Sequence, residues 1–198
     1  MTVERAESQL LSVEDYLAWE DLQEKRHEYI GGMVYAMAGG MPVHSGIAAN
    51  VIGSLGVQLR GKRCRPYTSD LKVRITYPTH TRFYYPDVTV ACTTAPPQQL
   101  FHDEPVVVIE VASESTRRTD ELEKRDAYQS IPTLKVYALL DQDRPAAVVW
   151  RRGRDGFGFV REIYSGIEAV IPLPEIESAL PLTEAYEGIT FAPAQPAE

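Results

Sequence analysis

Two runs of β-branched residues, joined by a polar loop, constrain the fold of this chain more than any other feature. The runs are Tyr85–Cys92 and Pro105–Val111. Residues of this type, bounded by turn formers, predict two strands. The second run is apolar on both faces, as in a strand inside a sheet, and yet it contains Glu110. Because an ionised carboxylate is costly to bury alone, we expect Glu110 to have a partner.

We expect the two runs to pair as an antiparallel hairpin. The segment from Asp87 to Cys92 equals the segment from Pro105 to Glu110 in length, so Asp87 would face Glu110 and Cys92 would face Pro105. Directly opposed residues have Cβ atoms roughly 4.5–5.5 Å apart. Two carboxylates at this distance repel, so one should take up a proton or both should hold a cation. Mg²⁺ suits such a pair, because it typically binds one or two carboxylates together with water and substrate phosphate. Two unrelated acids in a different register are the alternative.

The length and composition are those of an ordinary globular protein. The chain has 198 residues, 44% hydrophobic and 24% charged, which predicts one domain over residues 1–191, followed by a mobile tail at 192–198. No run of about 18 apolar residues exists, so no membrane-spanning helix is expected, and the acidic N-terminal segment does not fit a signal peptide.

Cys64 and Cys92 form no CxxC pair and imply no disulfide framework, which predicts a reduced, cytoplasmic setting. The net charge of −8 argues against broad electrostatic binding to nucleic acid.

The rest of the pattern predicts helices and strands around the hairpin. Gly31 and Gly32 between two apolar runs indicate a tight turn, with Glu28 at its entrance, where an exposed strand-end acid is the alternative. Apolar residues recurring at i, i+4 predict a helix over residues 42–60. The other expected elements are a short helix after Ser12, a strand beginning near Tyr67, a loop over 76–85, a helix ending near Ser130, a strand over 135–140, a hairpin of segments 146–151 and 157–163, and a short helix over 180–186.

A series of short motifs follows this order of helix, three strands, helix and strand. The motifs are His27–Gly32, Pro86–Val88, Val108–Thr116, Asp120, Lys124, Tyr128, Asp141 and Leu182–Gly188. Together they resemble the PD-(D/E)XK nuclease superfamily, and more narrowly a restriction-endonuclease-like family of the Uma-two type, formerly a domain of unknown function. The resemblance covers most of the chain. It implies an α/β (α+β) fold with a restriction endonuclease-like core, in which helices flank a central mixed β-sheet, with an N-terminal hairpin and a C-terminal β-hairpin extension.

One position departs from the superfamily pattern. The lysine expected two residues after the Glu is Ala112 in this chain. The narrower family places that lysine on the following helix, which corresponds to Lys124. Asp120 and Lys124 are spaced i, i+4, so an exposed helix ion pair is the alternative interpretation of Lys124.

The resemblance implies a Mg²⁺- or Mn²⁺-dependent endonuclease that hydrolyses DNA phosphodiester bonds. Asp87, Glu110 and the Val111 carbonyl would hold the metal, which would bind a phosphate oxygen and activate water. Lys124 would orient that water or stabilise charge in the transition state, and Glu28 would complete the site from the first hairpin. Enzymes of this fold are often two-fold assemblies, so we expect a homodimer.

A second hypothesis is a catalytically weak or inactive nucleic-acid-binding or structural member of the same fold. The acidic charge and the missing lysine at residue 112 favour it. A glycosidase fits poorly, because its carboxyl groups stand at least about 5 Å apart around a sugar and no aromatic sugar platform is evident near the pair. A serine or cysteine nucleophile is unsupported, because the chain has no G-x-S-x-G turn.

Overall fold

The computed structural model of the protein describes residues 10–37, 40–94, 96–113 and 120–191. The expected tail at 192–198 and the side chain of Asp120 lie outside this description. The elements, in chain order, are α1 (Val13–Glu20), β1 (His27–Ile30), β2 (Met33–Ala36), α2 (Pro42–Gln58), β3 (Arg65–Thr68), β4 (Lys72–Thr76), β5 (Thr81–Tyr84), β6 (Val88–Ala91), β7 (Phe101–His102), β8 (Pro105–Ala112), the π-helical turn η1 (Asp120–Lys124), α4 (Arg125–Gln129), β9 (Val136–Asp141), β10 (Ala146–Arg152), β11 (Phe159–Ser165), β12 (Val170–Leu173), the 3₁₀ turn η2 (Pro174–Ile176), β13 (Ser178–Pro181) and α5 (Leu182–Ala185).

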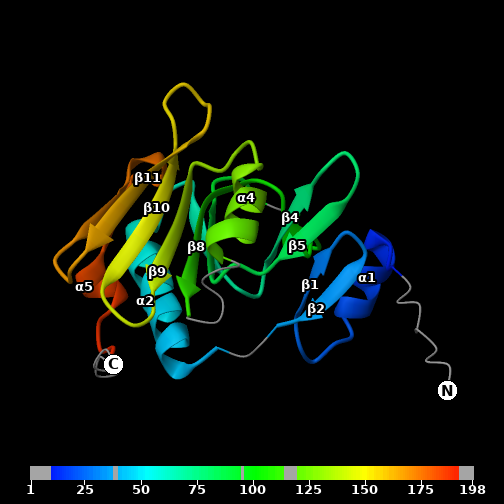
Figure 1. Cartoon of the computed structure of the whole chain (residues 1–198), viewed down its shortest axis with the longest axis horizontal. Helices are drawn as coiled ribbons and strands as arrows, with labels where there is room; N and C mark the ends of the chain where they lie inside the picture. Colours follow the sequence, from blue (N-terminus) through cyan, green and yellow to red (C-terminus); the bar gives the residue numbers. More distant parts are fainter. Residues whose placement is uncertain (1–9, 38–39, 95, 114–119, 192–198) are drawn as a thin grey trace, which may run out of the picture.

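A six-stranded mixed sheet forms the centre of the molecule, with the strand order β11-β10-β9-β8-β6-β3. The β8–β9 pair is parallel, and every other pair in this sheet is antiparallel. Helices α2 and α4 cover opposite faces of the sheet (Figure 1). The expected α/β fold with a central mixed sheet flanked by helices is therefore confirmed, and the late hairpin β10–β11 extends that sheet at one edge.

The alternation of β8 explains how one strand serves two cores. Its odd-numbered residues Val107, Ile109 and Val111 pack in the core on the α2 side. Val108 and Ala112 pack in the core on the α4 side, and Glu110 lies between them in the alternation. Burial on both faces is typical of an interior strand, so the near-continuous apolar run of this segment follows from its place in the sheet.

The pairing of β6 with β8 follows the expected register over most of its length. Val88 faces Ile109 and Val90 faces Val107. A bulge between Val90 and Ala91 then shifts the register, so that Ala91 faces Pro105 and the expected pairing of Cys92 with Pro105 is wrong.

A second sheet of five strands, in the order β2-β1-β5-β4-β7, lies beside the first (Figure 1). The single strand expected to begin near Tyr67 is two strands, β3 and β4, which belong to different sheets and are separated by a turn at 69–71. The loop expected over 76–85 contains β5, whose Phe83 and Tyr84 are buried. The reason for β5 is burial: Phe83 and Tyr84, which would be exposed on a loop, are buried in the second sheet.

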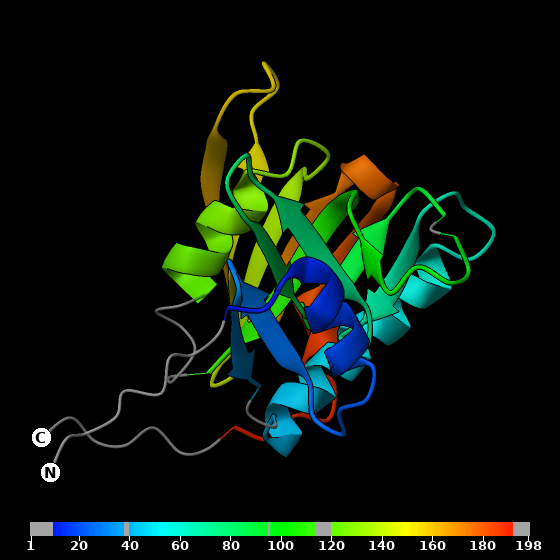
Figure 2. The ribbon, with the colours of Figure 1, turned by 90° about the vertical axis from the view of Figure 1, so that its right-hand side faces the viewer.

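The N-terminal hairpin turns at Gly31 and Gly32, as expected. Both glycines have positive φ, +57° and +102°, a conformation that other residues rarely adopt. A Cβ on Gly32 would also lie 2.8 Å from the Cβ of Leu10. Figure 2 shows α1 packed against this hairpin, where Tyr16 and Tyr29 stack with ring centroids 4.8 Å apart.

Cys64 and Cys92 form a disulfide, which corrects the expectation of two unpaired thiols. Arg65 pairs with Ala91 across β3 and β6, so the cysteines that flank this pair face each other, with Cα atoms 3.9 Å apart. The two cysteines are 28 residues apart in the chain, a distance at which sequence spacing gives no signal. The cytoplasmic setting inferred from free thiols loses its basis, because disulfides persist mainly in oxidising environments. Among the helices of the described ranges, none is long and apolar enough to span a bilayer.

Candidate functional site

Asp87 and Glu110 lie side by side where β6 begins. The backbone N–H of Asp87 donates a hydrogen bond to Glu110 Oε2 over 3.2 Å, and the backbone N–H of Val111 donates one to Asp87 Oδ2 over 2.8 Å. The Asp87 side chain is 16% exposed and the Glu110 side chain 4%. Each carboxylate thus accepts a hydrogen bond from a main-chain N–H of the opposite segment. The two acids lie next to each other, as the matched lengths of the two runs predict.

Glu110 is buried with partners on the α4 side of the sheet. Tyr128 in α4 donates its hydroxyl to Glu110 Oε1 over 3.1 Å. Burial raises the pKa of Tyr128 well above its ordinary value, and the charge of Glu110 raises it further. Tyr128 therefore stays protonated and acts as a hydrogen-bond donor to the carboxylate.

Lys124 reaches the same carboxylate from the end of the turn η1. Its Nζ lies 3.0 Å from Glu28 Oε1 and 3.6 Å from Glu110 Oε1. The Lys124 side chain is only 12% exposed, which does not fit the alternative of an exposed helix ion pair. The helical element expected in this region begins, within the described residues, as a π-helical turn, and such turns are frequent at functional sites.

Glu28 comes to the cluster from β1. Its side chain is 16% exposed, so the alternative of an exposed strand-end acid does not hold. The four side chains named from the sequence, Asp87, Glu110, Lys124 and Glu28, therefore belong to one connected cluster built from the start of β6, the strands β8 and β1, and the turn η1.

His44 also belongs to this cluster, although the sequence does not single it out. It lies in the first turn of α2, and its Nε2 is 3.1 Å from Asp87 Oδ2. A lone histidine on a helix is more often a cap or a surface group, and only the packing of α2 across the β6–β8 pair reveals its partner. The one available signal is its place at the start of a long helix that runs across the central sheet.

A shell of paired charges borders Lys124. Glu123 accepts a hydrogen bond from the Tyr84 hydroxyl over 3.1 Å and lies 3.5 Å from the guanidinium of Arg82. Burial raises the pKa of Tyr84 above its ordinary value, so this hydroxyl also remains a donor. Arg125 pairs with Asp126 over 2.7 Å. The described cations of this shell are therefore neutralised by carboxylates of the same chain.

The donor set of Asp87, Glu110 and the Val111 carbonyl suits a hard divalent cation. Carboxylate and carbonyl oxygens are the ligands that Mg²⁺ prefers, and one or two carboxylates suffice when water and phosphate complete its shell. Over the described ranges, no three or more His, Cys, Asp or Glu side chains are grouped so that they could hold a metal ion. A metal at this place would accordingly depend on main-chain and solvent oxygens.

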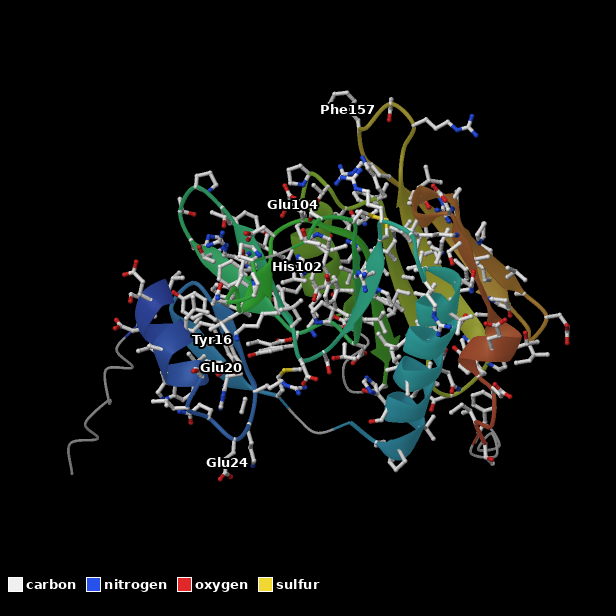
Figure 3. All side chains as sticks on the ribbon, turned by 180° about the vertical axis from the view of Figure 1, so that it is seen from behind. Tyr16, Glu20, Glu24, His102, Glu104 and Phe157 are labelled. Carbon is white, nitrogen blue, oxygen red and sulfur yellow. A yellow bond between two sulfur atoms is a disulfide. The ribbon has the colours of Figure 1, made fainter. Side chains whose placement is uncertain are left out.

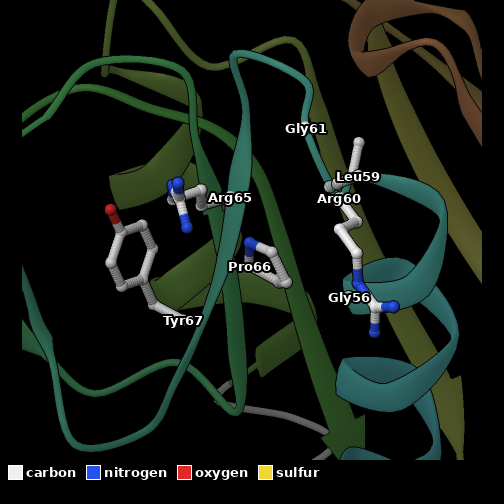
Figure 4. Close-up of a pocket in the computed structure, with 7 residues that line it drawn as sticks. All are labelled: Gly56, Leu59, Arg60, Gly61, Arg65, Pro66 and Tyr67. Atoms are coloured by element: carbon white, nitrogen blue, oxygen red, sulfur yellow. The ribbon is translucent and has the colours of Figure 1, made fainter.

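A hollow of about 460 Å³ lies elsewhere, between the end of α2 and the edge strand β3 (Figure 4). It is lined by Gly56, Leu59, Arg60, Gly61, Arg65, Pro66 and Tyr67. None of the side chains that the sequence singles out lines it, so the cluster around Asp87 remains the candidate site on the chemistry of its groups.

Comparisons with known proteins show which family this chain belongs to and which fold it shares. The model of the family described as "Uma2: Putative restriction endonuclease" matches residues 13–183. A Synechocystis sp. protein, "Uncharacterized protein slr1290", is 31% identical over 91% of this chain and 94% of its own length. A second one, "Uncharacterized protein sll1609", is 26% identical over 69% of this chain and 78% of its own length. The crystal structure of "a putative nuclease belonging to DUF820" from Anabaena variabilis has a TM-score of 0.68 at 19% identity, covering 89% of this chain and 97% of that one, and so shares the fold.

Proposed function

We propose that this chain, which belongs to the Uma2 family, is a divalent-metal-dependent nuclease that hydrolyses DNA phosphodiester bonds. The family description supports a nuclease. Mg²⁺ or Mn²⁺ as the metal, DNA as the substrate and the roles of individual residues are our inference from the geometry of the cluster.

The position of Lys124 is the observation that carries this proposal. The superfamily pattern requires a lysine near the second carboxylate, and residue 112 is an alanine. Lys124 nevertheless brings its ammonium to 3.6 Å from Glu110 Oε1. Lys124 in the turn η1 thus supplies the positive charge that β8 lacks at residue 112. This supports a catalytically active site over an inactive one.

The residues of the cluster have distinct parts in this proposal. A divalent cation held by Asp87, Glu110 and the Val111 carbonyl would neutralise charge on a phosphate oxygen and lower the pKa of an attacking water. The main-chain hydrogen bonds between the two segments hold both carboxylates side by side. Lys124 stabilises the charge that develops on the phosphate in the transition state. Glu28 holds Lys124 in place through their ion pair. Tyr128 holds Glu110 in place through a hydrogen bond.

A catalytically weak scaffold of the same fold remains the second candidate function. The ion pair of Lys124 with Glu28 favours it, because a lysine engaged by one carboxylate has less freedom to serve a substrate. The net charge of −8 also works against binding a polyanion.

We also propose that the protein is a homodimer. The edge strand β11 exposes Val160 and Ile163, which are 60% and 65% exposed. A two-fold axis beside this edge would pair the two copies of β11 and remove an unpaired strand edge in each copy. Light scattering at micromolar concentration tests the proposal, and a monomeric mass would contradict it.

Cleavage of plasmid DNA tests the proposed function. With Mg²⁺, we expect wild type to nick or linearise the plasmid, and we expect the metal chelator EDTA to stop the reaction. Asp87→Asn should abolish cleavage, because it removes the charge that holds the metal. Asp103→Asn is the matched control, since Asp103 pairs with Arg74 away from the cluster. Absence of cleavage of both the plasmid and a single-stranded oligonucleotide by wild type, with any divalent metal, would favour the scaffold instead.

A further inference from the structure

An exposed aromatic surface borders the cluster on the β1–β2 hairpin. Tyr35 is 45% exposed and Met33 is 47% exposed, and the Tyr35 hydroxyl donates to Met33 Sδ over 3.4 Å. The two residues are two positions apart on β2, so their side chains stand on the same face of the hairpin. We call this pair of side chains the Tyr35–Met33 platform.

The platform lies at the rim of the candidate site. Tyr35 is the direct partner of Glu28 in the β1–β2 register, which puts their Cβ atoms roughly 4.5–5.5 Å apart on one face. Glu28 on that face contacts Lys124 over 3.0 Å, and Lys124 contacts Glu110. The platform is therefore one side chain away from the lysine at the centre of the cluster.

The other face of the hairpin is already used by the fold. Tyr29 packs against α1 and Phe83, and the His27 ring lies 4.7 Å from the Trp19 ring. The need to bury apolar surface thus explains the aromatic residues of β1 but leaves Tyr35 and Met33 without such an explanation. A tyrosine ring offers an apolar face with a polar end, which is why tyrosine is enriched at binding surfaces.

Electrostatic attraction alone gives this site little affinity for DNA. The described cations nearest the cluster, Arg82, Lys124 and Arg125, each pair with a carboxylate of the chain. The whole chain carries a net charge of −8. Stacking of a base on an aromatic ring does not depend on free cations, so it can supply affinity where phosphate contacts are few.

We propose that the Tyr35–Met33 platform holds an unstacked base of the substrate beside the phosphodiester bond at Asp87 and Glu110. This inference rests on the proposed nuclease function and names its substrate class. A base inside a continuous duplex is stacked on both faces by its neighbours, so it reaches a protein ring only after it leaves the stack. The favoured substrate is accordingly DNA with unpaired nucleotides at the cut, such as a single strand or a frayed end.

Binding of single-stranded and duplex oligonucleotides, with Ca²⁺ in place of Mg²⁺, tests the proposal. The single strand carries 2-aminopurine, whose fluorescence falls when it stacks. We expect wild type to prefer the single strand and to quench the probe. Tyr35→Ala should weaken single-strand binding by about 5- to 150-fold and abolish the quenching, whereas Tyr35→Phe should retain both. Affinity should fall by less than about tenfold between 50 and 200 mM salt, because few phosphate contacts contribute.

Phe157 provides the matched control. It is 83% exposed at the tip of the β10–β11 hairpin, which Figure 3 shows at the top of the view, away from Tyr16 and α1 at the lower left. Phe157→Ala should bind both oligonucleotides as wild type does. If Tyr35→Ala also binds the single strand as wild type does, or if wild type prefers the continuous duplex, the platform has no such role.

Two further outcomes separate the platform from the nuclease function on which it rests. A change in mass of Tyr35→Ala by light scattering would assign the platform to a second copy of the chain and overturn the proposal. Mg²⁺-dependent cleavage that Tyr35→Ala leaves unchanged overturns the platform alone. Failure of wild type to bind or cut any DNA overturns the nuclease function and the platform together.

Discussion

The backbone N–H of Asp87 donates a hydrogen bond to the Glu110 carboxylate, with 3.2 Å between N and Oε2. In the opposite direction, the backbone N–H of Val111 donates a hydrogen bond to the Asp87 carboxylate, with 2.8 Å between N and Oδ2. Two segments 23 residues apart thus fix each other's carboxylates through main-chain atoms. These two main-chain hydrogen bonds hold both carboxylates beside each other at the start of β6.

Divalent-metal binding should therefore depend on both carboxylates. Titration calorimetry with Mg²⁺ or Mn²⁺ should show binding to wild type, because two acids share one site and their repulsion is relieved by a cation. Asp87→Asn and Glu110→Gln should each remove the binding heat, and Asp103→Asn should leave it unchanged. Binding that survives both changes in the pair would reject the site.

The disulfide between Cys64 and Cys92 should contribute to stability. It closes a loop between residues 28 positions apart, and in the chain-entropy model a loop of this size contributes about 3–4 kcal/mol. Urea unfolding with and without a reductant measures the difference, which should disappear in the Cys64→Ser variant. Two reactive thiols per chain in the unreduced, denatured protein would contradict the bond.

The stability of the protein should fall below about pH 6.5. Burial lowers the pKa of His102 from its ordinary value of 6.5, and the nearby charges of Asp103 and Glu104 only partly oppose this. The unfolded chain therefore binds more protons at this residue than the folded one does. The stability from neutral His102 is present above pH 6.5 and is lost as the pH falls from there through the folded pKa. Urea unfolding at several pH values should show this slope, and His102→Gln should reduce it. Equal slopes in the two proteins would contradict the prediction.

Local pattern was sufficient for the elements that carry the candidate carboxylates. The matched lengths of the two runs predict the register of β6 with β8, and this register holds until the bulge between Val90 and Ala91. The Gly31–Gly32 turn is predicted from local sequence too, since glycine adopts its positive-φ conformations more readily than other residues do.

Features that depend on the second sheet or on long-range register could not be predicted in this way. The split of β3 from β4 and the strand β5 arise from which sheet buries each segment, and propensity does not encode that choice. The Cys64–Cys92 bond depends on a register between β3 and β6, and the contact of His44 with Asp87 depends on how α2 crosses the sheet. The position of Lys124 came from a family resemblance, and its contact with Glu28 depends on the approach of the hairpin to η1.

Single-turnover DNA cleavage measures whether Lys124, from the turn η1, acts together with the carboxylates of Asp87 and Glu110. Lys124→Ala and the exposed control Lys135→Ala should be compared with wild type at saturating Mg²⁺. We expect Lys124→Ala to cut about 10²–10³-fold more slowly, because the lost ammonium acts chiefly in the transition state. Its metal affinity, measured by calorimetry, should be no weaker than that of wild type, and Lys135→Ala should cut at the wild-type rate. Equal cleavage rates for Lys124→Ala and wild type would contradict this role of Lys124.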